Sequence, residues 1–264
     1  SSVDPKLSFR YQASDNLALR ASFSTSFREA SLAQLTSTNI SLQGIQDYNA
    51  DGSAKGGTAF IRIAQANNPN LAPEESDNMN IGAMWKPSDK LSMTLDYWAI
   101  DYTNVITIES AQGKVAANPL DSDVKRTAGG TLTGVTTKYF NAANVNTSGL
   151  DFESTYDFDT SFGQAQVGVN MMHMFEYEIP VGNSTKDVVG LFNHDNFARS
   201  LPDTKAVFHA ALNSGNNSLS LFGRYTGDYK TTRPLDATAK ARGFSQSIDS
   251  FFTVELMKAD LVEM

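Results

Sequence analysis

Segments with a two-residue hydrophobic period recur along the chain, and short and long connections alternate between them. In residues 150–158, Leu150, Phe152, Tyr156 and Phe158 alternate with acidic or hydroxyl side chains. Because successive side chains of a strand point to opposite faces, such a segment has one apolar face and one polar face. The same period recurs near residues 7–11, 17–23, 79–85, 91–97, 165–171, 206–212, 219–225 and 252–256. We therefore predict about nine strands and almost no helix.

The connections indicate how these strands are joined. Short links at residues 14–16, 87–90, 159–163 and 213–217 are rich in residues that tolerate tight turns. Long links occupy roughly residues 26–75, 103–146, 178–202 and 229–247, and we expect a short helical turn only within residues 28–35. Loops longer than about 12–15 residues are uncommon in compact soluble domains. Short turns at one end and long loops at the other are typical of an all-β, antiparallel, up-and-down transmembrane β-barrel.

The composition agrees with this fold class and excludes several others. The 264 residues contain no cysteine, which excludes a disulfide scaffold, a thiolate metal site and a cysteine nucleophile. The net charge of −8 argues against a nucleic-acid partner. No apolar run is long enough for a transmembrane helix, and the first residues lack the features of a signal peptide. A mean hydropathy of −0.30 is compatible with barrel strands, which are only half apolar.

Four strings, in this order along the chain, resemble strands and loop ends of TonB-dependent outer-membrane receptors. They span residues 17–35, 67–87, 91–106 and 143–158. The second contains an Asn-Pro-x-Leu-x-Pro-Glu motif, and the fourth an Asn-x-x-x-x-Gly-hydrophobic-Asp motif. The motif residues are Asn68, Pro69, Leu71, Pro73, Glu74, Gly149 and Asp151.

These motifs also have a physical meaning of their own. Pro69 and Pro73 lack amide donors, so they indicate a loop returning to the barrel rim rather than a strand interior. Glu74 precedes an alternating run and can remain in water. Gly149 would allow close backbone approach where a strand enters the wall.

The resemblance implies a plugged barrel of about 22 strands that imports a scarce nutrient with energy delivered through TonB. We expect residues 1–264 to be the C-terminal portion of such a barrel, a fragment of about nine strands, with the plug domain and upstream strands outside it. The implied location is the outer membrane of a Gram-negative bacterium. The implied partners are outer-membrane lipid, a TonB-type system acting through the plug, and a siderophore, vitamin, carbohydrate or peptide. An isolated sheet with two unpaired edges would not form a stable pore in lipid.

Two other functions fit the same pattern. A passive porin-like channel would share the barrel strands and need no plug. A β-sandwich at the cell surface would also show period-2 strands and would bind a partner through the long loops.

Candidate binding residues come from the loops and the polar phase of the strands. They are Arg28, Tyr48, Trp98, Tyr102, Tyr139, His194, Arg199 and Arg233. The three histidines lie on separate segments, and no nucleophile motif or phosphate-binding glycine loop occurs. We therefore expect a protein that is not an enzyme and uses no cofactor or metal.

One string resembles part of a calcium loop. Residues 47–52 match the first half of the EF-hand pattern, but the twelfth position is Thr58 instead of a bidentate Glu. A turn on an extracellular loop is the favoured interpretation of Asp47 and Asp51. Asp121 and Asp123 could likewise either bind calcium weakly or lie as solvated side chains on a loop.

Overall fold

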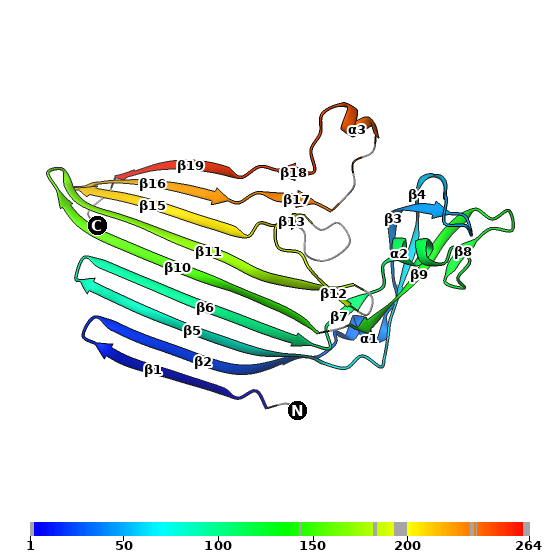
Figure 1. The fold of residues 1–264 in the computed structure, drawn as a ribbon, viewed down its shortest axis with the longest axis horizontal. Helices are drawn as coiled ribbons and strands as arrows, with labels where there is room; N and C mark the ends of the chain where they lie inside the picture. Colours follow the sequence, from blue (N-terminus) through cyan, green and yellow to red (C-terminus); the bar gives the residue numbers. More distant parts are fainter. Residues whose placement is uncertain are drawn as a thin grey trace.

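The computed structural model describes residues 3–142, 144–181, 184–192, 200–232, 235 and 237–260. Figure 1 shows a broad antiparallel sheet with a smaller group of strands and helices beyond one of its ends. Within the described residues, no helix is long and apolar enough to cross a membrane.

The large sheet, here called the wall, contains the nine strands that the sequence predicts. Neighbouring strands are antiparallel throughout, and four of the eight neighbouring pairs are hairpins of consecutive strands. In sheet order they are β1 (Lys6–Ser14), β2 (Leu17–Arg28), β5 (Glu74–Ser88), β6 (Leu91–Thr103), β10 (Val145–Thr160), β11 (Gly163–Val181), β15 (Thr204–Ser214), β16 (Asn217–Thr226) and β19 (Phe251–Asp260). A short strand, β12 (Ser184–Asp187), extends the sheet beside the end of β11.

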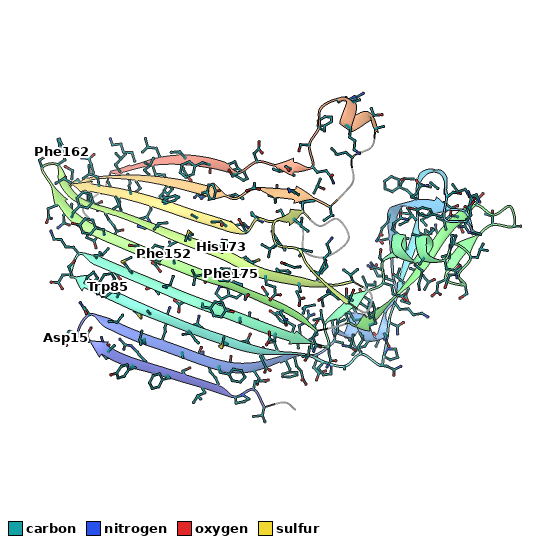
Figure 2. The ribbon with its side chains drawn as sticks, in the orientation of Figure 1. Asp15, Trp85, Phe152, Phe162, His173 and Phe175 are labelled. Carbon is teal, nitrogen blue, oxygen red and sulfur yellow. The ribbon has the colours of Figure 1, made fainter. Side chains whose placement is uncertain are left out.

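All four predicted short turns lie at one end of the wall, and the long connections lie at the other (Figure 1). Asp15 and Phe162 mark two of these turns in Figure 2. β1 and β19 each pair with a wall strand on one side only. The predicted alternation of link lengths is therefore confirmed.

The register places the apolar side chains of neighbouring strands on the same face of the wall. Phe9 lies opposite Ala21, and Ala21 lies opposite Ile81. Many of these side chains are exposed, with Phe9 at 64% and Ile81 at 52%. A sheet whose apolar face is bare in this way needs a cover other than its own chain. We call this the apolar face, and the opposite one the polar face.

The long connections are more ordered than the sequence predicts, because two of them fold into a subdomain with its own core. Here β3 (Asn39–Tyr48), β4 (Ala54–Ala66), β9 (Leu132–Asn141) and β7 (Ile106–Ile108) form a sheet, and β8 (Val124–Arg126) pairs with β9. Its buried core residues are Ile45, Ile61, Ile63, Ala111, Val115, Val124, Leu132 and Val135. The prediction of about nine strands therefore missed these additional strands, which lie within the long links of residues 26–75 and 103–146.

The helices are few and short. α1 (Leu32–Thr36) confirms the predicted helical turn, and the Ser31 side chain caps it by accepting from the Gln34 amide. α2 (Ala111–Ala117) and α3 (Ala237–Ala241) were not predicted. α2 completes the loop subdomain by burying Ala111 and Val115 against it.

A second, smaller group joins the remaining two long connections. β13 (Leu191–Phe192) lies between β14 (Ser200–Leu201) and β17 (Tyr229–Thr231), and β17 pairs with β18 (Ser247–Ile248). Ile179 and Val188 form its small buried core. Both groups lie beyond the loop end of the wall.

Candidate functional site

An ion pair crosses the middle of the polar face between strands that are not neighbours. Arg20 on β2 binds Asp96 on β6 with two hydrogen bonds, one of them 2.8 Å from Nε to Oδ1. β5 runs between them, and Gly82 occupies the crossing point. A Cβ on residue 82 would lie 2.0 Å from Asp96 Oδ1, so only glycine leaves room for this pair.

A row of charges extends this pair along the wall. Arg10 lies opposite Arg20, and Asp151 lies opposite Asp96. Glu153, Asn170 and Lys205 line an open depression of about 520 Å³ together with Asp96 and Asp151. The predicted motif residue Asp151 is therefore placed on the polar face, where water or a partner can reach it.

Two glycines, Gly149 and Gly168, leave room for the rings of neighbouring side chains on the polar face. A Cβ on Gly149 would lie 2.5 Å from the Trp98 ring, and one on Gly168 would lie 2.2 Å from the His209 ring. The register also shifts between Ser148 and Gly149. The predicted close approach at Gly149 is thus confirmed, and the neighbour that requires it is Trp98.

The Asn-Pro-x-Leu-x-Pro-Glu motif connects the segments at the loop end of the wall, here called the rim. Its first part, residues 68–73, lies outside any strand, as its prolines predict. Asn68 Nδ2 donates to the Tyr139 carbonyl at 2.8 Å. Asn141 binds both the amide and the carbonyl of Ala72, at 2.8 and 2.9 Å.

Glu74 makes the last of these rim contacts. Its carboxylate forms an ion pair with Arg28 and accepts from the Ile106 amide at 2.7 Å. The motif residues 68–74 therefore tie the starts and ends of two long connections to the wall. We call the contacts of Asn68, Ala72 and Glu74 with Tyr139, Asn141, Arg28 and Ile106 the rim clamp.

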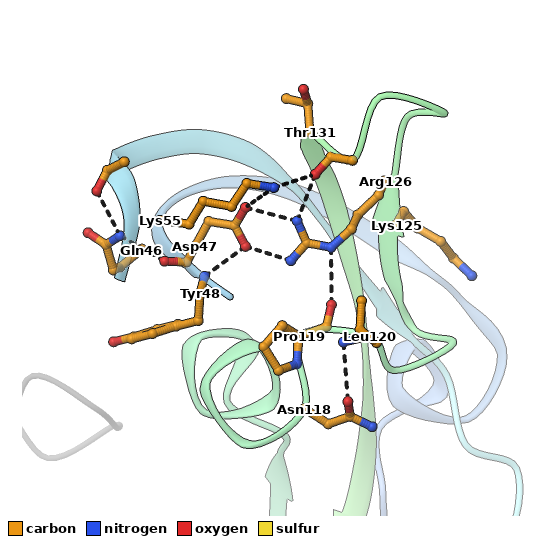
Figure 3. A network of polar contacts seen from close by, with 12 residues as sticks. Gln46, Asp47, Tyr48, Lys55, Asn118, Pro119, Leu120, Lys125, Arg126 and Thr131 are labelled. Carbon is orange, nitrogen blue, oxygen red and sulfur yellow. Dashed lines mark hydrogen bonds and ion pairs between the residues drawn. The ribbon is translucent and has the colours of Figure 1, made fainter. Parts of the chain in front are cut away.

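A buried ion pair fixes the loop subdomain (Figure 3). Arg126 donates to both carboxylate oxygens of Asp47, at 2.8 and 2.5 Å. It also donates to the carbonyls of Pro119 and Gly130, so each of its three nitrogens makes at least one hydrogen bond. Its guanidinium lowers the pKa of Asp47, and the nearby Lys55 ammonium lowers it further.

The calcium-like string is a turn, as favoured from the sequence. The Gly52 amide donates to the Asn49 carbonyl, and the Asp51 carboxylate accepts from the Ser53 amide and hydroxyl. The Asp47 carboxylate accepts hydrogen bonds from Arg126, and the Asp123 carboxylate accepts one from Lys114 Nζ at 2.8 Å. In the part of the chain that the structure describes, no group of three acidic or histidine side chains could hold a metal ion.

The candidate binding residues lie in separate places. Arg28 and Tyr102 are at the loop end of the wall, Trp98 is farther along the same face, and Tyr48 packs against the loop core. Tyr139 contributes its carbonyl to the rim clamp. His194, Arg199 and Arg233 lie outside the described residues. No hydrogen bond or ion pair joins the side chains of the candidates that the structure describes, so a shared pocket among these residues remains a proposal.

Sequence reasoning missed Gly82 and Arg126 as positioning residues. Gly82 lies within a regular strand, and nothing in the sequence shows that Asp96 reaches across it. Arg126 lies 79 residues from Asp47, a pairing that only the folded subdomain reveals.

Comparison with known proteins gives a consistent result. A family model described as "TonB dependent receptor-like, beta-barrel" matches residues 1–259. A search of curated proteins found no match. Solved structures with a similar fold include the ferric enterobactin receptor PfeA from Pseudomonas aeruginosa in complex with enterobactin, with a TM-score of 0.62 and 16% identity over 98% of this chain.

Two further similar structures are the siderophore receptor PirA from Acinetobacter baumannii and the FrpB iron transporter from Neisseria meningitidis. Their TM-scores are 0.58 and 0.52, and their identities 13% and 11%, over 96% and 97% of this chain. The chain spans about a third of the length of these proteins, namely 33% of PfeA, 34% of PirA and 32% of FrpB. At such identities the likeness shows the fold.

Proposed function

The chain belongs to the TonB-dependent receptor β-barrel family, and we propose that it forms the C-terminal part of the wall of a receptor that imports a small-molecule nutrient. Members of this family are outer-membrane proteins of Gram-negative bacteria and act as receptors and transporters. The observation that carries the proposal is the family match over residues 1–259, together with a wall that is apolar on one face and charged on the other.

In this function the two faces have different solvents. The apolar face meets outer-membrane lipid, and the polar face lines a wet interior filled by a plug domain from elsewhere in the receptor. Asp151 and Glu153 can then contact the plug or a passing ligand. Energy reaches the plug through a TonB-type system.

Among the nutrient classes open from the sequence, we propose a ferric siderophore. The support is that PfeA is a ferric enterobactin receptor, PirA a siderophore receptor and FrpB an iron transporter. Capture would involve Arg28, Tyr102 and the loop residues Tyr48, Tyr139, His194, Arg199 and Arg233, with Trp98 farther inside.

The test is uptake by cells that lack the gene encoding this chain. Under iron limitation, the deletion strain should lose uptake of at least one ⁵⁵Fe-labelled siderophore, and the full-length gene should restore it. Restoration should fail in a strain without TonB. Uptake that continues without TonB would indicate the passive channel instead, and growth dependent on another nutrient would contradict the siderophore class.

A further inference from the structure

Among the described residues, two positive charges on the polar face, those of Arg10 and Lys6, have no acidic partner. Arg10 and Arg20 lie directly opposite each other on β1 and β2, and like charges in this position are unfavourable. Arg20 is neutralised by Asp96 across Gly82. Arg10 makes only a 3.3 Å hydrogen bond to the neutral Gln12 side chain.

Lys6 adds a second free charge. It lies on the same face of β1 as Arg10, because their positions differ by an even number of residues. Within the described part of the chain, no carboxylate lies within ion-pair distance of Lys6 or Arg10. Arg10 therefore faces the like charge of Arg20 across the strand pair, and among the described residues neither Arg10 nor Lys6 has a compensating carboxylate.

These cations surround an open depression of about 530 Å³. Its polar lining consists of Lys6, Ser8, Arg10, Arg20, Ser22 and Asn80. Every one of these side chains can donate a hydrogen bond, and none is acidic. The neighbouring depression differs in that its lining contains the carboxylates Asp96, Asp151 and Glu153 beside the cations Arg20 and Lys205, and the Arg20–Asp96 pair lies between the two depressions.

We propose that the depression formed by Lys6, Ser8, Arg10, Ser22 and Asn80 binds an oxyanion, a phosphate or carboxylate group. A guanidinium presents a fork of donors that matches two oxygens of such a group, and an ammonium and hydroxyls can bind the others. The anion would relieve the repulsion between Arg10 and Arg20. The site rests on the proposed function in one respect, that the polar face lines a wet interior.

Two sources could supply this group: a dissolved solute in the interior, or a carboxylate of another receptor segment. The test uses the purified full-length receptor, with inorganic phosphate as the probe and thermal unfolding as the readout. The variants are Arg10→Gln and Lys6→Gln. Lys205→Gln is the matched control, because Lys205 is a cation on the same face but lines the neighbouring depression.

If the group is a solute, phosphate should raise the melting temperature of the wild type, and Arg10→Gln should weaken the apparent phosphate affinity by about tenfold or more. If it is a carboxylate of the receptor, phosphate should have no effect, and Arg10→Gln should itself lower the melting temperature. Lys205→Gln should match the wild type in both cases. Both results support an oxyanion site and distinguish its source.

The proposal is overturned if Arg10→Gln and Lys6→Gln match Lys205→Gln with and without phosphate. Nutrient uptake is measured separately on the same variants. Loss of the proposed transport function would appear as absent uptake in the wild type, whereas failure of the oxyanion site leaves that uptake intact.

Discussion

At the scale of single residues, the missing side chain of Gly82 has the largest effect on the polar face. The ion pair between Arg20 and Asp96 exists because nothing projects from the strand between them. Serine or alanine would satisfy the alternating pattern equally well. The position is therefore constrained by a neighbour's side chain and not by backbone conformation.

We expect Gly82→Ala to displace Asp96 and to break its hydrogen bonds with Arg20. The cost should be about 1–3 kcal/mol in the free energy of unfolding. The measurement is urea unfolding of the full-length receptor in detergent micelles. Gly57→Ala is the control, because no atom lies within 4 Å of a Cβ at that position. Equal stability of the two variants would contradict this account.

A second prediction concerns Asp47 and its pH dependence. Arg126 lowers the pKa of Asp47 in the folded subdomain below its unfolded value, which is near 3.9. The stabilisation is therefore complete above that unfolded value and is lost as the pH falls through the lower, folded value. Asp47→Asn should destabilise the subdomain at pH 7 by on the order of 3 kcal/mol, because it leaves Arg126 without its buried partner.

Hydrogen exchange of the β3 and β9 amides, corrected for intrinsic rates, measures this effect. Protection in the wild type should be constant from pH 7 to about pH 4 and should fall below that. Asp51→Asn is the matched control, because Asp51 lies in the adjoining turn and contacts only Ser53. Lys114 also lowers the pKa of Asp123. Any pH dependence of protection that persists in Asp47→Asn is therefore expected to come from Asp123. Full protection of Asp47→Asn at pH 7 would refute the role of the pair.

At the scale of elements, the rim clamp joins loops to wall strands through side chains of a single short segment. Asn141 is its most connected member, with hydrogen bonds to both backbone groups of Ala72 and to the Asn104 carbonyl. These bonds hold the segment before β5 against the segment after β6. The clamp therefore fixes where the loop subdomain attaches.

Asn141→Ala should loosen this attachment without unfolding the wall. Three partly exposed hydrogen bonds are lost, so we expect about 1–2 kcal/mol of local destabilisation. Faster proteolysis near residues 67–73 would report it. Asn39→Ala is a suitable control, because Asn39 makes only a 3.4 Å contact with Gln65. Cleavage at the same rate in both variants would show that the clamp is dispensable.

The elements also show what the sequence could predict. All nine wall strands were predictable, because each is long, alternates regularly and ends in residues that favour turns. The loop subdomain was not, because β7 and β8 contain three residues each and β4 pairs with β9 in parallel, with Arg62 opposite Gly134. Strands that pair across so many residues leave no signal in the sequence near either strand. For the same reason, the sequence did not show that the motif residues pair with Tyr139 and Asn141.

At the scale of the whole molecule, the wall has two strands with an unpaired side, β1 and β19. Unpaired backbone groups are costly in lipid, where water cannot satisfy them. The exposed apolar side chains of β19, such as Val254 and Leu256, add to this cost in water. The wall is therefore stable only where further strands or another cover protect both edges.

We expect residues 1–264 alone to form no heat-resistant barrel and no steady conductance in planar bilayers. The full-length receptor should migrate as a compact, heat-modifiable band on gels and should resist protease. The same refolding protocol applied to both provides the comparison. A heat-resistant, protease-resistant species from the isolated chain would show that it closes its own edges.

The parallel pairing of β4 with β9 also determines an order of assembly. The hairpin of β5 and β6, residues 74–103, lies between these two strands in the sequence. The subdomain core, which draws on both sides of that hairpin, cannot close until the hairpin has been synthesised and brought back to the same end. Contacts between residues so far apart in sequence form slowly, because a large loop must close first. The loop subdomain should therefore be among the last parts of this region to fold, after the adjoining wall strands have paired.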